Sequence, residues 1–189
     1  VRSATLNSTL LMSLITSSSP EKSLHLVDLD GVLINSKNAV YHAYRIALKE
    51  VVDRDLTERT FQTCVWGRPA SIARDNLRVN PELWEIVHFR KNELYCKMDP
   101  GMVNYPLIDY LQGKEVEIVT AGSEDATAHK MSKIDLKCRA LRSSAAKMDH
   151  AFWVRYSGKI VVIDDDPMVL RIAKKALPQA VMFHVAETY

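Results

Sequence analysis

Short apolar runs alternate with stretches of helical periodicity along most of the chain. Five runs have the length and composition of strands: residues 24–30, 116–120, 138–144, 159–165 and 180–185. Three intervening or following stretches have helical character: residues 106–113, 123–134 and 167–177. Gly113 suits a helix C-terminus, Ser123 suits an N-cap and Pro167 suits a first helical turn. This alternation is typical of α/β folds and predicts a Rossmann-like parallel sheet.

One long segment departs from the alternation, because residues 37–103 contain no convincing strand. Apolar residues between Val40 and Val51 recur at helical spacing. A second helix is expected between Thr57, a possible N-cap, and Gly67, a possible stop, and a long third helix over residues 81–98. We therefore expect an α/β core of residues 21–36 and 104–189, with a helical cap of residues 37–103 inserted into it. Trp66 and Trp84 are expected in the core of the cap.

The first twenty residues differ in kind from the rest. They contain no acidic residue, one arginine, and many serines and threonines around a short apolar patch, Leu10 to Ile15. Two interpretations stay open for residues 1–20: a disordered tail, or an organellar targeting segment.

The composition is that of an ordinary globular protein, with 47% hydrophobic and 25% charged residues among 189. A formal charge of +2 without a sustained basic run argues against nucleic acid or an anionic membrane as a partner. No stretch is long and apolar enough to span a bilayer. The cysteines, Cys64, Cys96 and Cys138, lack metal-ligand spacing and favour free thiols in a reducing compartment. We expect a cytoplasmic protein, with organellar targeting by the N-terminal segment as the alternative.

Polar residues follow four of the predicted strands. In chain order they are Asp28 and Asp30; Thr120 with Ala121 and Gly122; Lys147; and Asp164, Asp165 and Asp166. In an open parallel sheet, ligands bind outside the carboxyl ends of the strands, where the loops converge. We therefore expect all four groups at one edge of the sheet.

Carboxylates gathered at one edge form an oxygen-rich site that suits Mg²⁺. A phosphate ester there would meet a repulsion of about 4 kcal/mol per close charge pair, which a divalent cation cancels. Asp28 can then attack phosphorus and form an aspartyl-phosphate, while Asp30 can protonate the leaving oxygen and later activate water. Thr120 and nearby backbone N–H groups can bind phosphoryl oxygens, and Lys147 can neutralise charge on Asp28 and the phosphate.

The run DLDGVLINS resembles motif I of the haloacid dehalogenase (HAD) superfamily. VEIVTAGS is similar to its motif II and IVVIDDDP to its motif IV, and the helical segment resembles the cap of the branch containing β-phosphoglucomutase and phosphoglycolate phosphatase. The resemblance implies Asp28 as nucleophile and Asp30 as acid/base, with the Asp30 backbone carbonyl on Mg²⁺. Aligned on motif IV, Asp165 becomes the main metal ligand of that motif, with Asp164 beside it. An acid at the Asp30 position implies phosphatase or phosphomutase chemistry, because dehalogenases and phosphonatases of the superfamily lack it.

The chain also departs from the family pattern. Motif IV often carries a second acid four residues on, where this chain has Val169, and the segment from Lys147 to Asp165 is shorter than usual, so that a helix there is trimmed. Lys130, Lys133 and Lys137 are rivals of Lys147 for the motif III lysine. Arg68, in a cap loop, is a candidate for substrate contact.

Three functional hypotheses follow. The first is a Mg²⁺-dependent phosphatase that hydrolyses a small phosphorylated metabolite through an aspartyl-phosphate. The second is a phosphomutase of sugar phosphates that uses the same residues and forms an isomer instead of inorganic phosphate. The third is a catalytically silent binding protein, which would fail to bind Mg²⁺ at millimolar concentrations.

Overall fold

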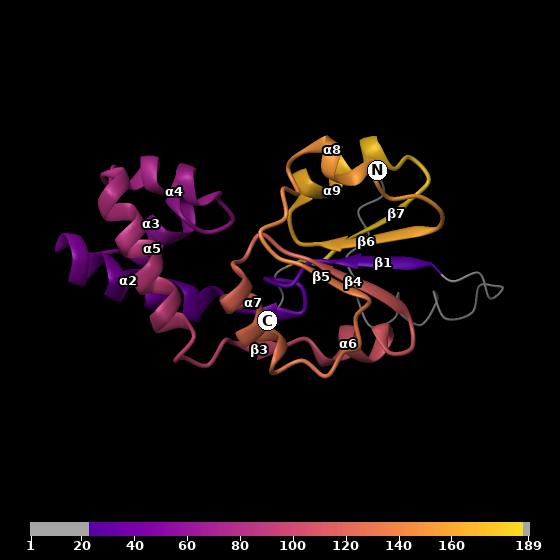
Figure 1. Cartoon of the computed structure of the whole chain (residues 1–189), viewed down its shortest axis with the longest axis horizontal. Coiled ribbons are helices and arrows are strands. Elements are labelled where there is room, and N and C mark those ends of the chain that lie inside the picture. The colour runs from indigo at the N-terminus through magenta and orange to yellow at the C-terminus, as the bar shows by residue number, and fades with distance from the viewer. Residues whose placement is uncertain (1–22, 187–189) are drawn as a thin grey trace.

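A computed structural model describes residues 23–186 and has a parallel sheet of five strands at its centre (Figure 1). The strands are β1 (Leu24–Val27), β4 (Glu115–Val119), β5 (Ala140–Arg142), β6 (Ile160–Asp164) and β7 (Val181–His184). Their spatial order is β5-β4-β1-β6-β7, and every neighbouring pair is parallel. The prediction of a Rossmann-like parallel sheet is confirmed. The N-terminal segment, residues 1–20, lies outside the described residues.

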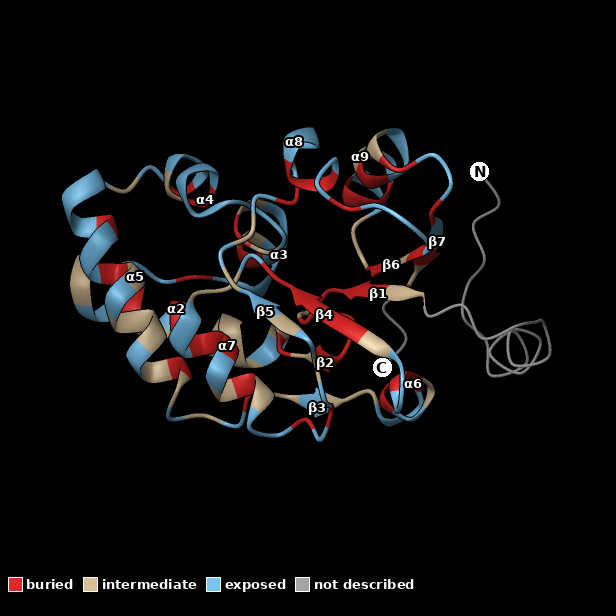
Figure 2. Cartoon of the chain, turned by 45° about the vertical axis from the view of Figure 1, so that its right-hand side comes forward, coloured by how far each residue is buried: buried red, intermediate tan, exposed pale blue. Residues whose placement is uncertain are grey.

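Helices cover both faces of this sheet (Figure 1). On one face lies α6 (Tyr105–Leu111), and on the other lie α8 (His150–Trp153) and α9 (Pro167–Ala176). Successive strand residues point to opposite faces, so that Leu26 packs with Trp153 and α9 while Val27 packs with Leu107 of α6. The central strands β1 and β4 are consequently the most buried part of the fold (Figure 2).

A separate group of helices lies at one end of the molecule, away from the sheet (Figure 1). It consists of α2 (Lys37–Val52), α3 (Glu58–Cys64), α4 (Ala70–Leu77) and α5 (Pro81–Tyr95). These four helices, called the helical unit below, share their own core, in which Tyr44 stacks on Trp84 with ring centroids 5.8 Å apart. Trp66 packs against Phe61 in the same core. Thr57 caps α3 by accepting a hydrogen bond from the backbone N–H of Thr60 at 3.1 Å, as its position indicated.

The helical unit is joined to the rest of the chain by a two-stranded antiparallel ribbon. Its strands are β2 (Ile34–Asn35) and β3 (Met102–Val103). The expectation that residues 37–103 contain no strand was therefore wrong at its C-terminal end. Strands of two residues are too short to produce a period-two pattern of apolar side chains.

Several of the observed elements are shorter than the predicted ones. β1 ends at Val27, so that Asp28 and Asp30 lie in the loop that follows it. Helix α8 has only four residues, which agrees with the expectation of a trimmed helix before motif IV. None of the helices in residues 23–186 is long and apolar enough to cross a membrane.

We expect Gly101→Ala to destabilise the fold more than Gly113→Ala. An added Cβ at Gly101 would lie 2.1 Å from the backbone oxygen of Asn35, which belongs to the ribbon and cannot move independently. Gly113 has a positive φ of 74° as well, but a Cβ there would meet nothing within 4 Å. The control variant, Gly113→Ala, should therefore lose about 1–2 kcal/mol of unfolding free energy from backbone strain alone. Chemical denaturation measures both losses, and equal losses would contradict the close approach at Gly101.

Candidate active site

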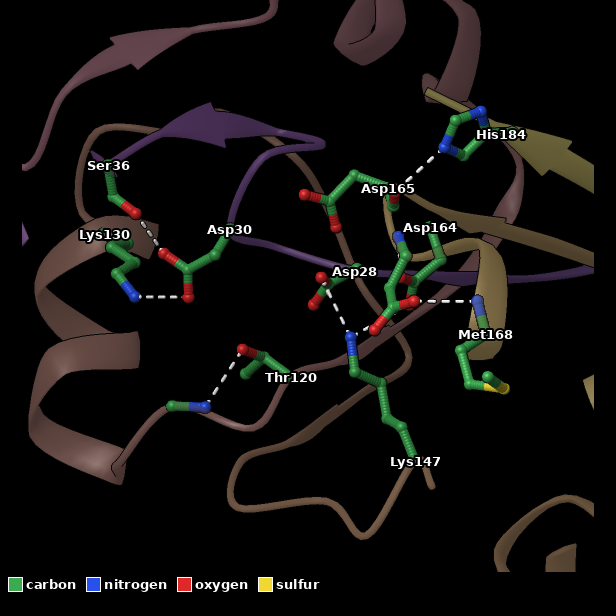
Figure 3. A network of polar contacts seen from close by, with 12 residues as sticks. Asp28, Asp30, Ser36, Thr120, Lys130, Lys147, Asp164, Asp165, Met168 and His184 are labelled. Carbon is green, nitrogen blue, oxygen red and sulfur yellow. Dashed lines mark hydrogen bonds and ion pairs between the residues drawn. The ribbon is translucent and has the colours of Figure 1, made fainter. Parts of the chain in front are cut away.

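Three aspartates from two neighbouring strands meet at the carboxyl edge of the sheet (Figure 3). Asp28 follows β1, Asp164 is the last residue of β6, and Asp165 follows it. Because β1 and β6 pair directly in parallel, both strand ends emerge side by side. One carboxylate oxygen from each residue lies within 4.8 Å of those from the other two. The fold thus brings together carboxylates that are more than 130 positions apart in the sequence.

Lys147 supplies positive charge to this cluster. Its ammonium group lies 2.9 Å from Asp28 Oδ2 and 2.9 Å from Asp164 Oδ2. The lysine is buried in the loop before α8, where its backbone oxygen accepts a hydrogen bond from Trp153 Nε1 at 2.7 Å. A side chain deep in the core therefore fixes the loop that carries the lysine.

The rival lysines lie elsewhere. Lys130 pairs with Asp30 at 2.6 Å, and Lys133 pairs with the exposed Asp99 at 2.8 Å. Lys137 is exposed in the loop before β5. Within the described part of the chain, Lys147 is the one of these four lysines that forms ion pairs with the three-aspartate cluster.

Burial and mutual repulsion perturb the cluster strongly. Burial raises the pKa of Asp28 well above its ordinary value, the neighbouring carboxylates raise it further, and Lys147 opposes both. Burial, followed by the charge of Asp164, raises the pKa of Asp165 to about 7. Burial acts to lower the pKa of Lys147, but the charges of Asp28 and Asp164 outweigh it and raise that pKa. Three carboxylates against one ammonium leave an uncompensated negative charge.

The donor set fits a hard divalent cation. Asp28 Oδ1 is buried and has no hydrogen-bond partner within residues 23–186. A buried carboxylate oxygen without a partner is costly, and a cation bound among these carboxylates would offset that cost and the excess negative charge. Carboxylate oxygens are the ligands that Mg²⁺ prefers. Asp28, Asp164 and Asp165 are therefore suited to hold such an ion.

The three consecutive acids after β6 have different roles. Asp164 pairs with Lys147 and accepts the backbone N–H of Asp166 at 2.9 Å. Asp166 is the N-cap of α9 and accepts the backbone N–H of Met168 at 2.7 Å, so it serves the helix and not the cluster. Val169, where the family pattern often has an acid, is 97% buried in the core beneath α9. The third carboxylate of the cluster comes from Asp164 instead.

Gly31 permits the approach of Asp165. A Cβ at Gly31 would lie 2.2 Å from Asp165 Oδ2, and the φ of +76° is one that other residues rarely adopt. The glycine after the two motif I aspartates is therefore required both by the turn and by the neighbouring carboxylate.

Asp30 points away from the other aspartates (Figure 3). Lys130 binds its Oδ2 at 2.6 Å, and the Ser36 hydroxyl donates a hydrogen bond to its Oδ1. The sequence did not identify either partner of Asp30. Nothing in the sequence marked Ser36 except its place before a predicted helix. Lys130 was considered only as an alternative to Lys147 for the motif III lysine.

The loop after β4 carries the candidate phosphate-binding residues. Thr120 is buried, and its Oγ1 accepts the backbone N–H of Gly122 at 3.2 Å. The Gly122 carbonyl accepts the backbone N–H of Ser144, which ties this loop to the one leading to Lys147. Ala121 is exposed between Thr120 and Gly122. Arg68 lies exposed between α3 and α4, and among the described residues it forms no ion pair with the aspartates of the cluster.

Comparisons with solved structures identify the fold. A predicted phosphoglycolate phosphatase from Haemophilus somnus 129PT matches at 13% identity and a TM-score of 0.68, over 91% of this chain and 90% of the other. A proposed β-phosphoglucomutase from Thermotoga maritima matches at 17% identity and a TM-score of 0.56, over 82% and 81%. A proposed HAD hydrolase, YfnB from Bacillus subtilis, solved with bound magnesium, matches at 14% identity and a TM-score of 0.62, over 84% and 86%. No protein-family model and no curated protein sequence matches the chain.

We expect Asp165→Asn to stabilise the metal-free protein at alkaline pH. The pKa of Asp165 is raised to about 7 in the folded chain, against about 3.9 in an unfolded one. This group therefore contributes stability below about pH 4 that is lost as the pH rises through about 7. The asparagine amide carries no charge. Relative to the wild type, the variant should therefore gain about 1 kcal/mol or more of unfolding free energy at about pH 8 and nothing at about pH 4.

Thermal melts in a chelating buffer at the two pH values provide the measurement. The same variant should lose stabilisation by added Mg²⁺, since it removes a ligand. A melting temperature that is lower in the variant than in the wild type at alkaline pH would contradict this view of the cluster.

Proposed function

We propose that this chain, which has the fold of HAD-superfamily hydrolases, is a Mg²⁺-dependent phosphatase acting on a small phosphorylated metabolite. The observation that carries the proposal is Asp28 Oδ1, a buried carboxylate oxygen without a protein partner beside Lys147 and two further carboxylates. This is the environment that a nucleophilic carboxylate needs: one oxygen is free to react, and the other is held in place by an ammonium group.

Asp28, Asp164 and Asp165 would hold Mg²⁺, together with the backbone carbonyl of Asp30. The bound ion would compensate the repulsion between the carboxylates and an incoming phosphate, about 4 kcal/mol per close pair. The remaining steps are carried by side chains of the chain itself.

The reaction proceeds in two displacements. Asp28 Oδ1 attacks phosphorus, the bond from phosphorus to the ester oxygen breaks, and Asp30 delivers a proton to the departing oxygen. A water molecule then attacks the aspartyl-phosphate, Asp30 accepts its proton, and the bond between phosphorus and Asp28 Oδ1 breaks. Inorganic phosphate leaves, and both aspartates return to their starting state.

Three further groups serve the phosphoryl oxygens. Lys147 already contacts Asp28, so its ammonium group lies beside the position of the transferred phosphoryl group. Thr120 and the backbone N–H groups of the Ala121–Gly122 loop emerge from β4, next to β1 in the sheet. These donors stabilise negative charge that develops in the transition state.

The helical unit is the part of the chain that selects the substrate in this proposal. It stands over the loops at the carboxyl edge and would exclude water when it closes. Arg68 is a candidate for contact with the remainder of the substrate. The likeness to a predicted phosphoglycolate phosphatase and to a magnesium-bound HAD hydrolase supports the metal and the substrate class.

We expect Asp28→Asn to abolish Mg²⁺-dependent phosphate release while the fold remains intact. The amide is a poor nucleophile and cannot form the aspartyl-phosphate. Asp166→Asn is the matched control, because it neutralises a carboxylate two residues from Asp164 that caps α9, and asparagine caps helices equally well. The assay measures inorganic phosphate from a panel of phosphorylated metabolites and an aryl phosphate, with and without Mg²⁺.

The outcomes separate the hypotheses. Substantial activity in the Asp28 variant would overturn the mechanism. Isomer formation from a hexose phosphate without phosphate release would favour a phosphomutase. Absence of Mg²⁺ binding by calorimetry at millimolar concentrations would favour a silent binding protein.

A further inference from the structure

Lys130 is a buried lysine that the proposed phosphatase chemistry does not yet use. It lies on α7 (Glu124–Met131), its side chain is only 4% exposed, and its ammonium group is 2.6 Å from Asp30 Oδ2. Within residues 23–186, Asp30 is the carboxylate with which Lys130 forms an ion pair. A buried charge is costly unless it is paired, and burial of an ion pair seldom adds net stability. The pair therefore calls for an explanation other than stability.

The surroundings of Lys130 are shaped to direct it at Asp30. Its ammonium group lies over the ring of Tyr95, 5.3 Å from the centroid. On another side, the position that a Cβ of Gly122 would occupy is 3.7 Å from Lys130 Nζ and 3.2 Å from Thr127 Oγ1. A side chain at Gly122 would crowd this space. The lysine thus passes between an aromatic ring and a glycine to reach the carboxylate.

Lys130 lies on α7, but two other groups around this ion pair lie at the ends of helices of the helical unit. Ser36, which donates to Asp30 Oδ1, immediately precedes α2, and Tyr95 is the last residue of α5. The Asp30 carboxylate is turned away from Asp28 and Asp165 and toward Lys130 and Ser36 (Figure 3). In an in-line displacement by Asp28, the departing oxygen would lie on the side of phosphorus opposite to Asp28. A carboxyl group held clear of Asp28 in this way is free to meet the departing oxygen.

We propose that Lys130 is a positioning residue for Asp30: together with Ser36 it fixes the rotation of the carboxyl group so that this group meets the departing oxygen. The inference rests on the proposed phosphatase function. Lys130 acts through Asp30, because its ammonium group is already occupied by that carboxylate. Lys130 therefore contributes to the rate only in steps that need Asp30.

The dependence of rate on the leaving group tests this role. A nitrophenolate departs readily without a proton, whereas a phenolate depends on the general acid. We expect kcat/KM of Lys130→Met to fall about tenfold or more further on phenyl phosphate than on p-nitrophenyl phosphate, as for Asp30→Asn. kcat/KM is the suitable quantity because it reports the first displacement, in which the proton is delivered. The double variant should lose no more than Asp30→Asn alone on phenyl phosphate.

Lys133→Met is the matched control. Lys133 follows α7, is 42% exposed, and pairs with Asp99, so its removal deletes a surface ion pair close to Lys130 in the chain. It should leave the leaving-group dependence unchanged. If circular dichroism shows that Lys130→Met does not fold, Ser36→Ala provides the test instead, because it removes the other partner of Asp30. Its kcat/KM should likewise fall further on phenyl phosphate than on p-nitrophenyl phosphate.

Equal losses of Lys130→Met on both substrates, or additional loss in the double variant, would overturn the positioning role while the phosphatase function stands. A higher kcat/KM in Lys130→Met than in the wild type would also overturn it, since Lys130 would then restrain Asp30 in an unproductive place. Absence of Mg²⁺-dependent activity in the wild type would instead overturn the proposed function, and this inference with it.

Discussion

The repulsion among Asp28, Asp164 and Asp165 is the constraint around which the site is arranged. Parallel pairing of β1 with β6 forces their carboxylates to one place, since both strand ends emerge at the same edge. Gly31 leaves space for Asp165, and Lys147 compensates part of the charge from a loop anchored by a tryptophan. The negative charge that remains uncompensated favours a divalent cation, as the proposed phosphatase function requires.

The sequence predicted the sheet and the acidic edge because both depend on short-range patterns. Continuous apolar runs identify strands that are buried on both faces, and parallel strands place their carboxyl ends together whatever their separation in the chain. Asp28 and Asp165 could therefore be brought together without any knowledge of side-chain conformations. Assigning Lys147 needed more, since four lysines had comparable positions and only the path of the loop before α8 distinguishes them.

The features that sequence reasoning missed depend on long-range contacts or on very short elements. The partnership of Lys130 with Asp30 joins residues 100 positions apart and has no periodicity to reveal it. The strands β2 and β3 have two residues each, so neither of them produces a recognisable pattern. Asp166 was expected at the acidic edge with Asp164 and Asp165, but its cap on α9 depends on local backbone geometry that only the structure reveals.

The ribbon of β2 and β3 has a consequence for how this architecture can diversify. The chain runs toward the helical unit through β2 and returns through β3, where Ile34 and Val103 are paired with each other. Everything between them begins and ends at neighbouring points, so the intervening segment could be lengthened, shortened or exchanged without shifting the register of the parallel strands. Under the proposed function, the segment that selects the ligand could therefore vary while the aspartates that follow β1 and β6 keep their places.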